Sequence, residues 1–308
     1  MNADKTDVWY CYRLILGRQP DADGWEHFQE RIEKQPMSPE ELGLGFITSE
    51  EFIAKHGPVF KQVDQGGITW FYNANDASIG RPLAEGKIHE PHISQLIIDA
   101  LRPGDSFLDI GASIGIHAFL VAKHFAGSVH VAMIEPSPIN CAAIRQSIEA
   151  NKFHNCTWYP IAGWDAIEPV NFTCDPLMSR ITTLVDSRIP IMIGLPLDVI
   201  LKPEYRVVKL DVDGSEARII RGMPKILERA EVLFFELNRA ALKAYSPNTT
   251  PLNILTVLMD SGFKTIEIIE PTGPDGLYQD PVALVKKIAS NPARSNYDLV
   301  LRKQKAPA

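Results

Sequence analysis

The sequence predicts an α/β protein in which a doubly wound, mostly parallel sheet follows a small all-helical N-terminal domain. From about residue 104 onward, short apolar runs of strand length alternate with segments of helical apolar spacing. Alternation of this kind builds a parallel sheet that helices cover on both faces. Residues 1–57 instead show helical periodicity throughout. We therefore expect a helical domain at residues 1–57 and an α/β domain at residues 58–308.

The first 57 residues carry clear signals for helix starts and stops. Val8, Tyr12 and Leu16 share one helix face, and Gly17 follows as a stop signal. Residues 38–41 (SPEE) form a capping box with proline at the first helical position. The opening YRLILGRQPDADG and the closing FITSEEF resemble a small bacterial helical domain of unassigned function. That resemblance implies a docking or adaptor module with a protein partner, and it supplies no chemistry.

The α/β domain begins with a hairpin or loop around residues 66–80. The strands that we expect after it are 106–110, 129–134, 157–161, 206–210, 232–237, 264–269 and 297–302. The helices that we expect are 91–101, 116–122, 138–151, 215–229 and 251–262. A Pro- and Gly-rich stretch at residues 270–296 separates the last two strands, and it suits a final strand that enters the sheet antiparallel.

The turn after the first strand of this domain is the most informative feature of the chain. Strand 106–110 carries a single acid, Asp109, and ends in the turn Gly111–Gly115, which has no bulky polar side chain. Such a turn lets a ligand lie against backbone N–H groups at the start of the next helix. Glu135 follows the second strand, where a doubly wound sheet receives the hydroxyls of a ribose. Asp109, Gly111, Gly115 and Glu135 together predict a nucleoside-binding site.

Three interpretations compete for this turn. A dinucleotide site requires G-x-G-x-x-G, but Ser113 replaces the middle glycine and no third glycine follows. The same letters spell the G-x-S-x-G nucleophile elbow of hydrolases, yet the last histidine, His154, comes too early for a Ser–Asp–His order. S-adenosylmethionine (SAM) has no phosphate, and the two carboxylates suit its amino group and its ribose. We therefore favour SAM, with a nicotinamide dehydrogenase as an alternative.

A second constellation lies at residues 206–214 (RVVKLDVDG). Alternate residues of a strand share a face, so Lys209, Asp211 and Asp213 point the same way. A lysine in a central strand needs a charged partner, and Asp211 is the natural one, whether for structure or for function. Glu236 ends the next strand. Glu135, Asp211 and Glu236 are thus expected at one edge of the sheet, where open α/β sheets bind ligands.

The motifs FLDIGASIG, EPSPIN, LPLDVI and VVKLDVDGSEARIIRGMPKIL closely resemble the FkbM family of SAM-dependent methyltransferases. The resemblance covers roughly residues 60–308 and implies the Rossmann-like class I methyltransferase fold. It implies methyl transfer from SAM to a hydroxyl of a sugar, a glycan or a related metabolite. By motif match it implies SAM contacts from Glu90, Asp109, Gly111, Ser113, Gly115, Glu135 and Asp165. The family usually has asparagine in place of Ser113 and glutamate in place of Asp213.

The chemistry requires alignment of the methyl donor with the acceptor hydroxyl and a group that takes the hydroxyl proton. We expect Asp211 to take this proton, with Lys209 setting its ionisation and Glu236 as the second candidate. We expect no metal ion. The alternative function is a catalytically inactive SAM-binding or interaction protein that acts through the helical N-terminal domain.

Composition excludes several classes of protein. A net charge of -7 and a pI near 5.7 argue against a nucleic-acid partner, because phosphate binding requires a basic face. No apolar run approaches the ~20 residues of a membrane span, and the polar N-terminus does not resemble a signal peptide. The four cysteines lack metal-ligand spacing. We expect a cytoplasmic protein with a small-molecule or glycan acceptor.

Overall fold

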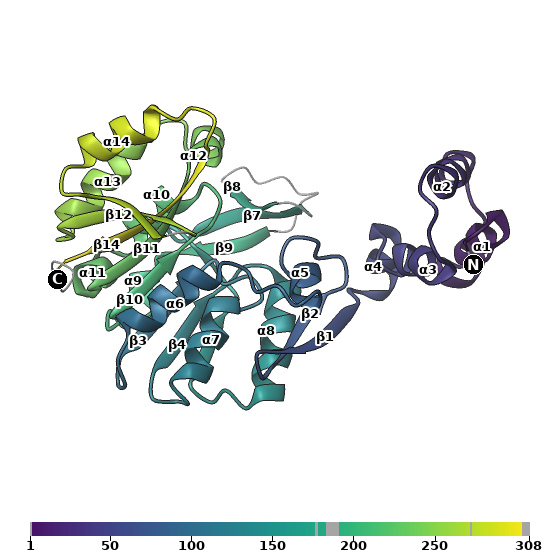
Figure 1. The fold of residues 1–308 in the computed structure, drawn as a ribbon, viewed down its shortest axis with the longest axis horizontal. Coiled ribbons are helices and arrows are strands. Elements are labelled where there is room, and N and C mark those ends of the chain that lie inside the picture. The colour runs from purple at the N-terminus through teal and green to yellow at the C-terminus, as the bar shows by residue number, and fades with distance from the viewer. Residues whose placement is uncertain (1, 176–177, 183–190, 272, 304–308) are drawn as a thin grey trace.

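The computed structural model describes residues 2–175, 178–182, 191–271 and 273–303. Its centre is an eight-stranded sheet in the order β13-β12-β14-β11-β10-β3-β4-β5 (Figure 1). The strands are β3 (Ser106–Ile110), β4 (His130–Ile134), β5 (Cys156–Tyr159), β10 (Val207–Leu210), β11 (Val232–Asn238), β12 (Thr265–Glu270), β13 (Gly273–Tyr278) and β14 (Asn296–Arg302). Strands β5, β4, β3, β10 and β11 pair parallel, and β14 enters antiparallel between β11 and β12. The predicted doubly wound sheet and its antiparallel final strand are confirmed.

Helices cover both faces of this sheet because its strands are apolar on both sides. Phe107 packs in one hydrophobic cluster, while its neighbour Leu108 packs in the other, on the opposite face. The first cluster includes residues of α6 (Pro91–Ala100), α7 (Ile116–His124) and α8 (Pro138–Asn151). The second includes residues of α9 (Leu197–Ile200), α10 (Glu216–Gly222), α11 (Pro224–Arg229), α12 (Arg239–Tyr245), α13 (Pro251–Asp260) and α14 (Pro281–Ala289).

Several elements differ from the sequence prediction. The single helix expected at 215–229 is divided into α10 and α11, because Pro224 cannot donate the hydrogen bond that would continue the helix through Met223. The stretch 270–296, expected as a connection, contains β13 and α14. A second sheet, also not predicted, has the order β6-β9-β7-β8. Its strands are β6 (Ala162–Gly163), β7 (Glu168–Asp175), β8 (Met178–Thr182) and β9 (Ile191–Leu195).

The N-terminal helices form a hydrophobic cluster of their own, set apart from the central sheet (Figure 1). They are α1 (Lys5–Tyr10), which continues into a π-helical turn at Cys11–Ile15, α2 (Ala22–Lys34), α3 (Pro39–Ile47) and α4 (Glu50–His56). The predicted capping box opens α3, since Ser38 and Glu41 exchange side-chain to backbone hydrogen bonds. A hairpin of β1 (Phe60–Gln65) and β2 (Ile68–Asn73) then joins the α/β part, followed by α5 (Gly80–Ala84). The hairpin is anchored to α8, where Phe71 N donates to Ser147 Oγ.

Candidate functional site

The turn Gly111–Gly115 lies between the residues that follow β10 and the ring of Phe119, and these two contacts explain its glycines. Gly111 has φ +83°, and a Cβ at this position would lie 1.7 Å from the backbone oxygen of Asp211. Gly115 has φ +87°, and a Cβ there would lie 2.7 Å from the ring of Phe119. Neither position therefore accommodates a side chain. The close approach brings the end of β10 against the turn that follows β3.

Glu135, directly after β4, holds this turn through its carboxylate. Its Oε2 accepts a hydrogen bond from Ser113 N (2.8 Å), while Oε1 accepts from Ser137 N (2.9 Å) and Asn140 Nδ2 (3.3 Å). The residue is only 4% exposed, and burial raises the pKa of its carboxyl to about 7. Ser113 has φ +52°, a conformation that favours glycine and asparagine. The structure thus joins Glu135 to the glycine turn.

Asp109 is buried within β3 and lacks a hydrogen-bond partner. The residue is 0% exposed, and neither carboxylate oxygen bonds to any residue that the structure describes. In the sheet it lies in register between Lys209 of β10 and Met133 of β4. Burial raises the pKa of Asp109. A buried carboxylate without a partner is costly unless a cation or a proton satisfies it.

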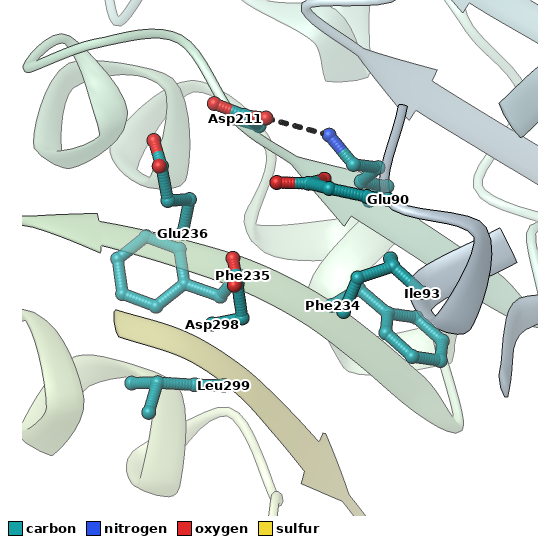
Figure 2. A pocket seen from close by; sticks show the side chains of 9 residues that line it. Glu90, Ile93, Asp211, Phe234, Phe235, Glu236, Asp298 and Leu299 are labelled. Carbon is teal, nitrogen blue, oxygen red and sulfur yellow. Dashed lines mark hydrogen bonds and ion pairs between the residues drawn. The ribbon is translucent and has the colours of Figure 1, made fainter. Parts of the chain in front are cut away.

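Beside these residues, a small pocket opens at the carboxyl ends of β10 and β11 (Figure 2). Lys209, 6% exposed, donates from Nζ to Oδ2 of Asp211 at 2.7 Å. Burial alone would raise the pKa of Asp211, but the charge of Lys209 outweighs it and lowers that pKa to about 2. The pocket lining consists of Glu90, Ile93, Lys209, Asp211, Phe234, Phe235, Glu236, Asp298 and Leu299.

Glu236 and Asp298 form a carboxyl pair across β11 and β14, where they are register partners. Burial and the charge of Asp211 raise the pKa of Glu236 to about 10. Burial likewise raises the pKa of Asp298 to about 6. Oε1 of Glu236 accepts a hydrogen bond from Asn296 Nδ2 at 3.1 Å. At neutral pH this pair therefore carries at least one proton.

Glu90 contributes a further carboxylate to the pocket from the start of α6. It has the left-handed conformation (φ +43°, ψ +55°), which is uncommon for a residue other than glycine. Its Oε2 lies 3.6 Å from Nε2 of His117, whose Nδ1 lies 2.8 Å from Oγ of Ser94. Burial alone would raise the pKa of Glu90, but His117 and the charge of Lys209 lower it. His117 is 5% exposed, and burial lowers the pKa of its ring.

His117 and Asp298 were not among the residues predicted from the sequence. Asp298 is the single acid in the apolar strand NYDLVLR, the same signal that marks Asp109 in SFLDI. His117 is the one polar side chain in the first two turns of α7, ahead of Lys123 and His124 in the last turn. Both signals are visible in the sequence, but only the register of β14 brings Asp298 to the pocket, and only the packing of α6 against α7 brings His117 beside Glu90.

Asp165 lies in a different environment from the other predicted residues. It follows β6, and its Oδ1 accepts from Arg218 Nη1 at 2.8 Å, while Oδ2 pairs with Arg221 Nη2 at 2.9 Å. Burial alone would raise the pKa of Asp165, but these two arginines lower it. The structure therefore places this carboxylate in an ion-pair network on α10, and its contact with an adenine stays a prediction.

Among the described residues, no three or more His, Cys, Asp and Glu side chains are grouped to hold a metal ion. In the same part of the chain, no helix has the length and apolar character required to cross a membrane.

The strand order, with β14 antiparallel between β11 and β12, defines the Rossmann-like class I methyltransferase fold. Residues 3–56 match the family model described as "Domain of unknown function (DUF4214)". This match agrees with the predicted resemblance of the N-terminal segment to a helical domain of unassigned function. No match was found among the curated proteins.

Several solved structures are similar to the chain at low sequence identity. M. jannaschii TYW2 in complex with S-adenosylmethionine is 12% identical, with a TM-score of 0.44 over 79% of this chain and 84% of that one. The precorrin-6y C5,15-methyltransferase of Geobacter metallireducens is 13% identical, with a TM-score of 0.39 over 71% and 92%. The Pyrococcus abyssi tRNA (uracil-54, C5)-methyltransferase, bound to S-adenosyl-L-homocysteine, is 10% identical, with a TM-score of 0.42 over 79% and 44%. With TM-scores below 0.5, these likenesses do not decide the function.

Proposed function

We propose that the chain is a SAM-dependent methyltransferase that transfers a methyl group to a hydroxyl of a sugar, a glycan or a related metabolite. One observation carries the proposal. The glycine turn, the buried carboxylates of Asp109 and Glu135, and a polar pocket meet at the carboxyl edge of one parallel sheet. This is the edge at which open α/β sheets bind nucleosides and their reaction partners.

Glu135 suits the ribose of SAM. A carboxylate has about four acceptor sites, and three hydrogen bonds already reach Glu135, two at Oε1 and one at Oε2. Oε2 therefore retains room for one ribose hydroxyl without any loss of the bonds that hold the turn. Ser113, whose N–H donates to the same oxygen, is half-buried in the turn and has the left-handed conformation.

Asp109 and Glu90 suit the cationic methionine part of SAM. Asp109 has two buried oxygens without a partner among the described residues, and an ammonium group nearby would offset that cost. Glu90 stays ionised beside His117 and lines the pocket. In this proposal Gly111 and Gly115 keep side chains away from the cofactor, and Asp165 contacts the adenine if its arginine partners leave one oxygen accessible.

SAM, when bound, supplies an electrophilic methyl group on a sulfonium. The residues of the chain then position the acceptor hydroxyl. Asp211, fixed by Lys209, holds a negative charge beside that hydroxyl, and Glu236 donates a hydrogen bond to the hydroxyl oxygen, since its pKa near 10 keeps it protonated. A carboxylate with a pKa near 2 is a weak proton acceptor, so Asp211 serves chiefly to orient the hydroxyl.

The remaining parts of the proposal concern partners and location. The acceptor is a small molecule or a glycan, and the protein acts in the cytoplasm. The N-terminal helices, with a hydrophobic cluster of their own, serve as a docking domain for a protein partner.

Isothermal titration calorimetry with SAM, S-adenosylhomocysteine and NADH tests the cofactor. We expect both sulfur nucleosides to bind and NADH to give no heat. Transfer of tritiated methyl from SAM to a panel of bacterial glycans and methyl glycosides then tests the reaction. Binding of NADH without SAM would contradict the proposal. Binding of SAM without transfer to any hydroxyl would favour the non-catalytic alternative.

A further inference from the structure

We infer that Asp298 is a catalytic residue, the group that takes the proton from the acceptor hydroxyl. The inference rests on the proposed function and changes the residue that the sequence favours for this step from Asp211 to Asp298. It also gives the antiparallel strand β14 a role in chemistry rather than in packing alone.

The pocket holds four carboxyl groups, and three of them are already engaged. Figure 2 shows these groups around a common space: Glu90, Asp211, Glu236 and Asp298. Asp211 is bonded to Lys209 at 2.7 Å, Glu236 to Asn296 at 3.1 Å, and Glu90 lies 3.6 Å from His117. Asp298 has no hydrogen bond or ion pair with any residue that the structure describes. Both of its oxygens are therefore available to a ligand, whereas each of the other three carboxyl groups has at least one oxygen in contact with a neighbouring residue.

The surroundings of Asp298 suit a proton acceptor that works near neutral pH. Its charged and titratable neighbours are Glu90 at the start of α6, Lys209 and Asp211 of β10, Glu236 on β11, and Arg294 just before β14. Its register partner on β12, Ile269, carries no charge. Burial, Glu90 and Asp211 raise the pKa of Asp298, and Lys209 and Arg294 lower it, so that it lies at about 6. A general base is most efficient when its pKa is close to the working pH.

Asp298 is a better acceptor of the hydroxyl proton than Asp211. The charge of Lys209 lowers the pKa of Asp211, whereas burial raises the pKa of Asp298, so Asp298 holds a proton more tightly than Asp211. Asp298 is also largely ionised at pH 7, as a base must be. Glu236, with a pKa of about 10, remains protonated at that pH and cannot accept the proton.

The step balances without a further reactant. A lone pair of the acceptor oxygen forms the new O–CH₃ bond while the S–CH₃ bond breaks and its electron pair stays on sulfur. The O–H bond breaks, and the proton passes to a carboxylate oxygen of Asp298. The products are the methyl ether, S-adenosylhomocysteine and a protonated Asp298, which releases its proton to solvent.

The decisive variant is D298N, with D260N as the matched control at the exposed C-terminal end of α13. The probes are tritiated SAM and methyl glycosides of common hexoses. We expect D298N to bind SAM as tightly as the wild type, to transfer methyl about 10²–10⁴-fold more slowly, and to lose the acid limb of the rate–pH profile. D260N should match the wild type in all three measurements.

Carbon-detected NMR titration of the wild-type aspartate carboxyls provides a readout that needs no acceptor. We expect the Asp298 signal to titrate near pH 6 and the Asp211 signal well below pH 4. An Asp298 that titrates below pH 4, or a D298N variant that transfers methyl at the wild-type rate, overturns this inference and leaves the proposed function intact. A wild-type protein that does not bind SAM overturns both.

Discussion

At the scale of single residues, Glu135 links the cofactor proposal to the geometry of the turn. Replacement by glutamine removes the charge and one of the two acceptor oxygens that hold Ser113 N and Ser137 N. Hydrogen bonds to charged groups contribute about 1.5–3 kcal/mol. We therefore expect E135Q to bind SAM at least about tenfold more weakly and to melt at a lower temperature. Calorimetry and thermal unfolding measure the two effects. Glu149, exposed on α8, provides the matched control E149Q, and an equal loss in both variants would contradict the assignment.

Replacement of Gly111 by alanine tests whether the fold requires the turn Gly111–Gly115 to lie against the end of β10. Alanine at a positive φ costs about 1–2 kcal/mol anywhere, but at Gly111 its Cβ would also meet the backbone of Asp211. Gly86 has φ +85° and no atom within 4 Å of such a Cβ, so G86A isolates the conformational cost. We expect G111A to lose clearly more stability than G86A in urea unfolding. Equal losses would show that the turn can move away from Asp211 freely.

The sequence identifies residues whose position depends on local pattern, and it misses those that depend on strand register. Asp109, Glu135, Lys209 and Asp211 each follow from one strand and its end, and the structure gathers them at one edge of the sheet. Asp298 lies 62 residues after Glu236 in the chain, and only the antiparallel register of β14 pairs the two. No periodicity within one segment encodes that pairing.

At the scale of elements, the N-terminal helices are predicted to fold independently of the sheet. Their apolar side chains pack among themselves, around Tyr12, Leu42 and Phe46. Deletion of residues 1–57 should therefore leave a folded remainder that binds SAM with the affinity of the full chain to within about twofold. Circular dichroism and calorimetry check this. An insoluble remainder would show that the helices and the sheet share one core.

The elements that sequence analysis missed have a common physical reason. Strands β7 and β9 pair with each other outside the main sheet, and their exposed apolar residues Ile191 and Ile193 break the alternation that marks a half-buried strand. Helix α14 lies in a stretch interrupted by several prolines and glycines, although Asp280 caps it and Leu284 and Ile288 are buried. In both places the secondary structure is stabilised by tertiary packing, which the local sequence pattern does not reveal.

At the scale of the whole molecule, the buried acids make stability depend on pH. Glu135 and Glu216 have pKa values raised to about 7, and Glu236 to about 10, by burial. A carboxyl whose pKa is higher in the folded state stabilises the fold below its unfolded pKa, and that contribution is lost as the pH rises through the folded pKa. We therefore expect the melting temperature to fall between pH 5 and pH 10. The opposite effect of Asp211 is confined to pH values below about 4.

The E236Q variant isolates the upper part of this range. Without the Glu236 carboxyl, the fall in melting temperature should become shallower from pH 5 to pH 10. Between pH 5 and pH 7 Glu135 and Glu216 should maintain part of the fall, whereas above pH 7 little of it should remain. Differential scanning fluorimetry across this range measures both. An unchanged profile in E236Q would mean that Glu236 titrates alike in the folded and unfolded chain.

The insertion of β14 between β11 and β12 has a consequence for biosynthesis. A ribosome produces β11 and β12 before β14, so each emerging strand exposes an unsatisfied edge until residues 296–302 have been made. Unpaired strand edges favour association between nascent chains. The sheet is therefore complete only after residues 296–302 have been made, and until then β11 and β12 each present an edge that is open to association.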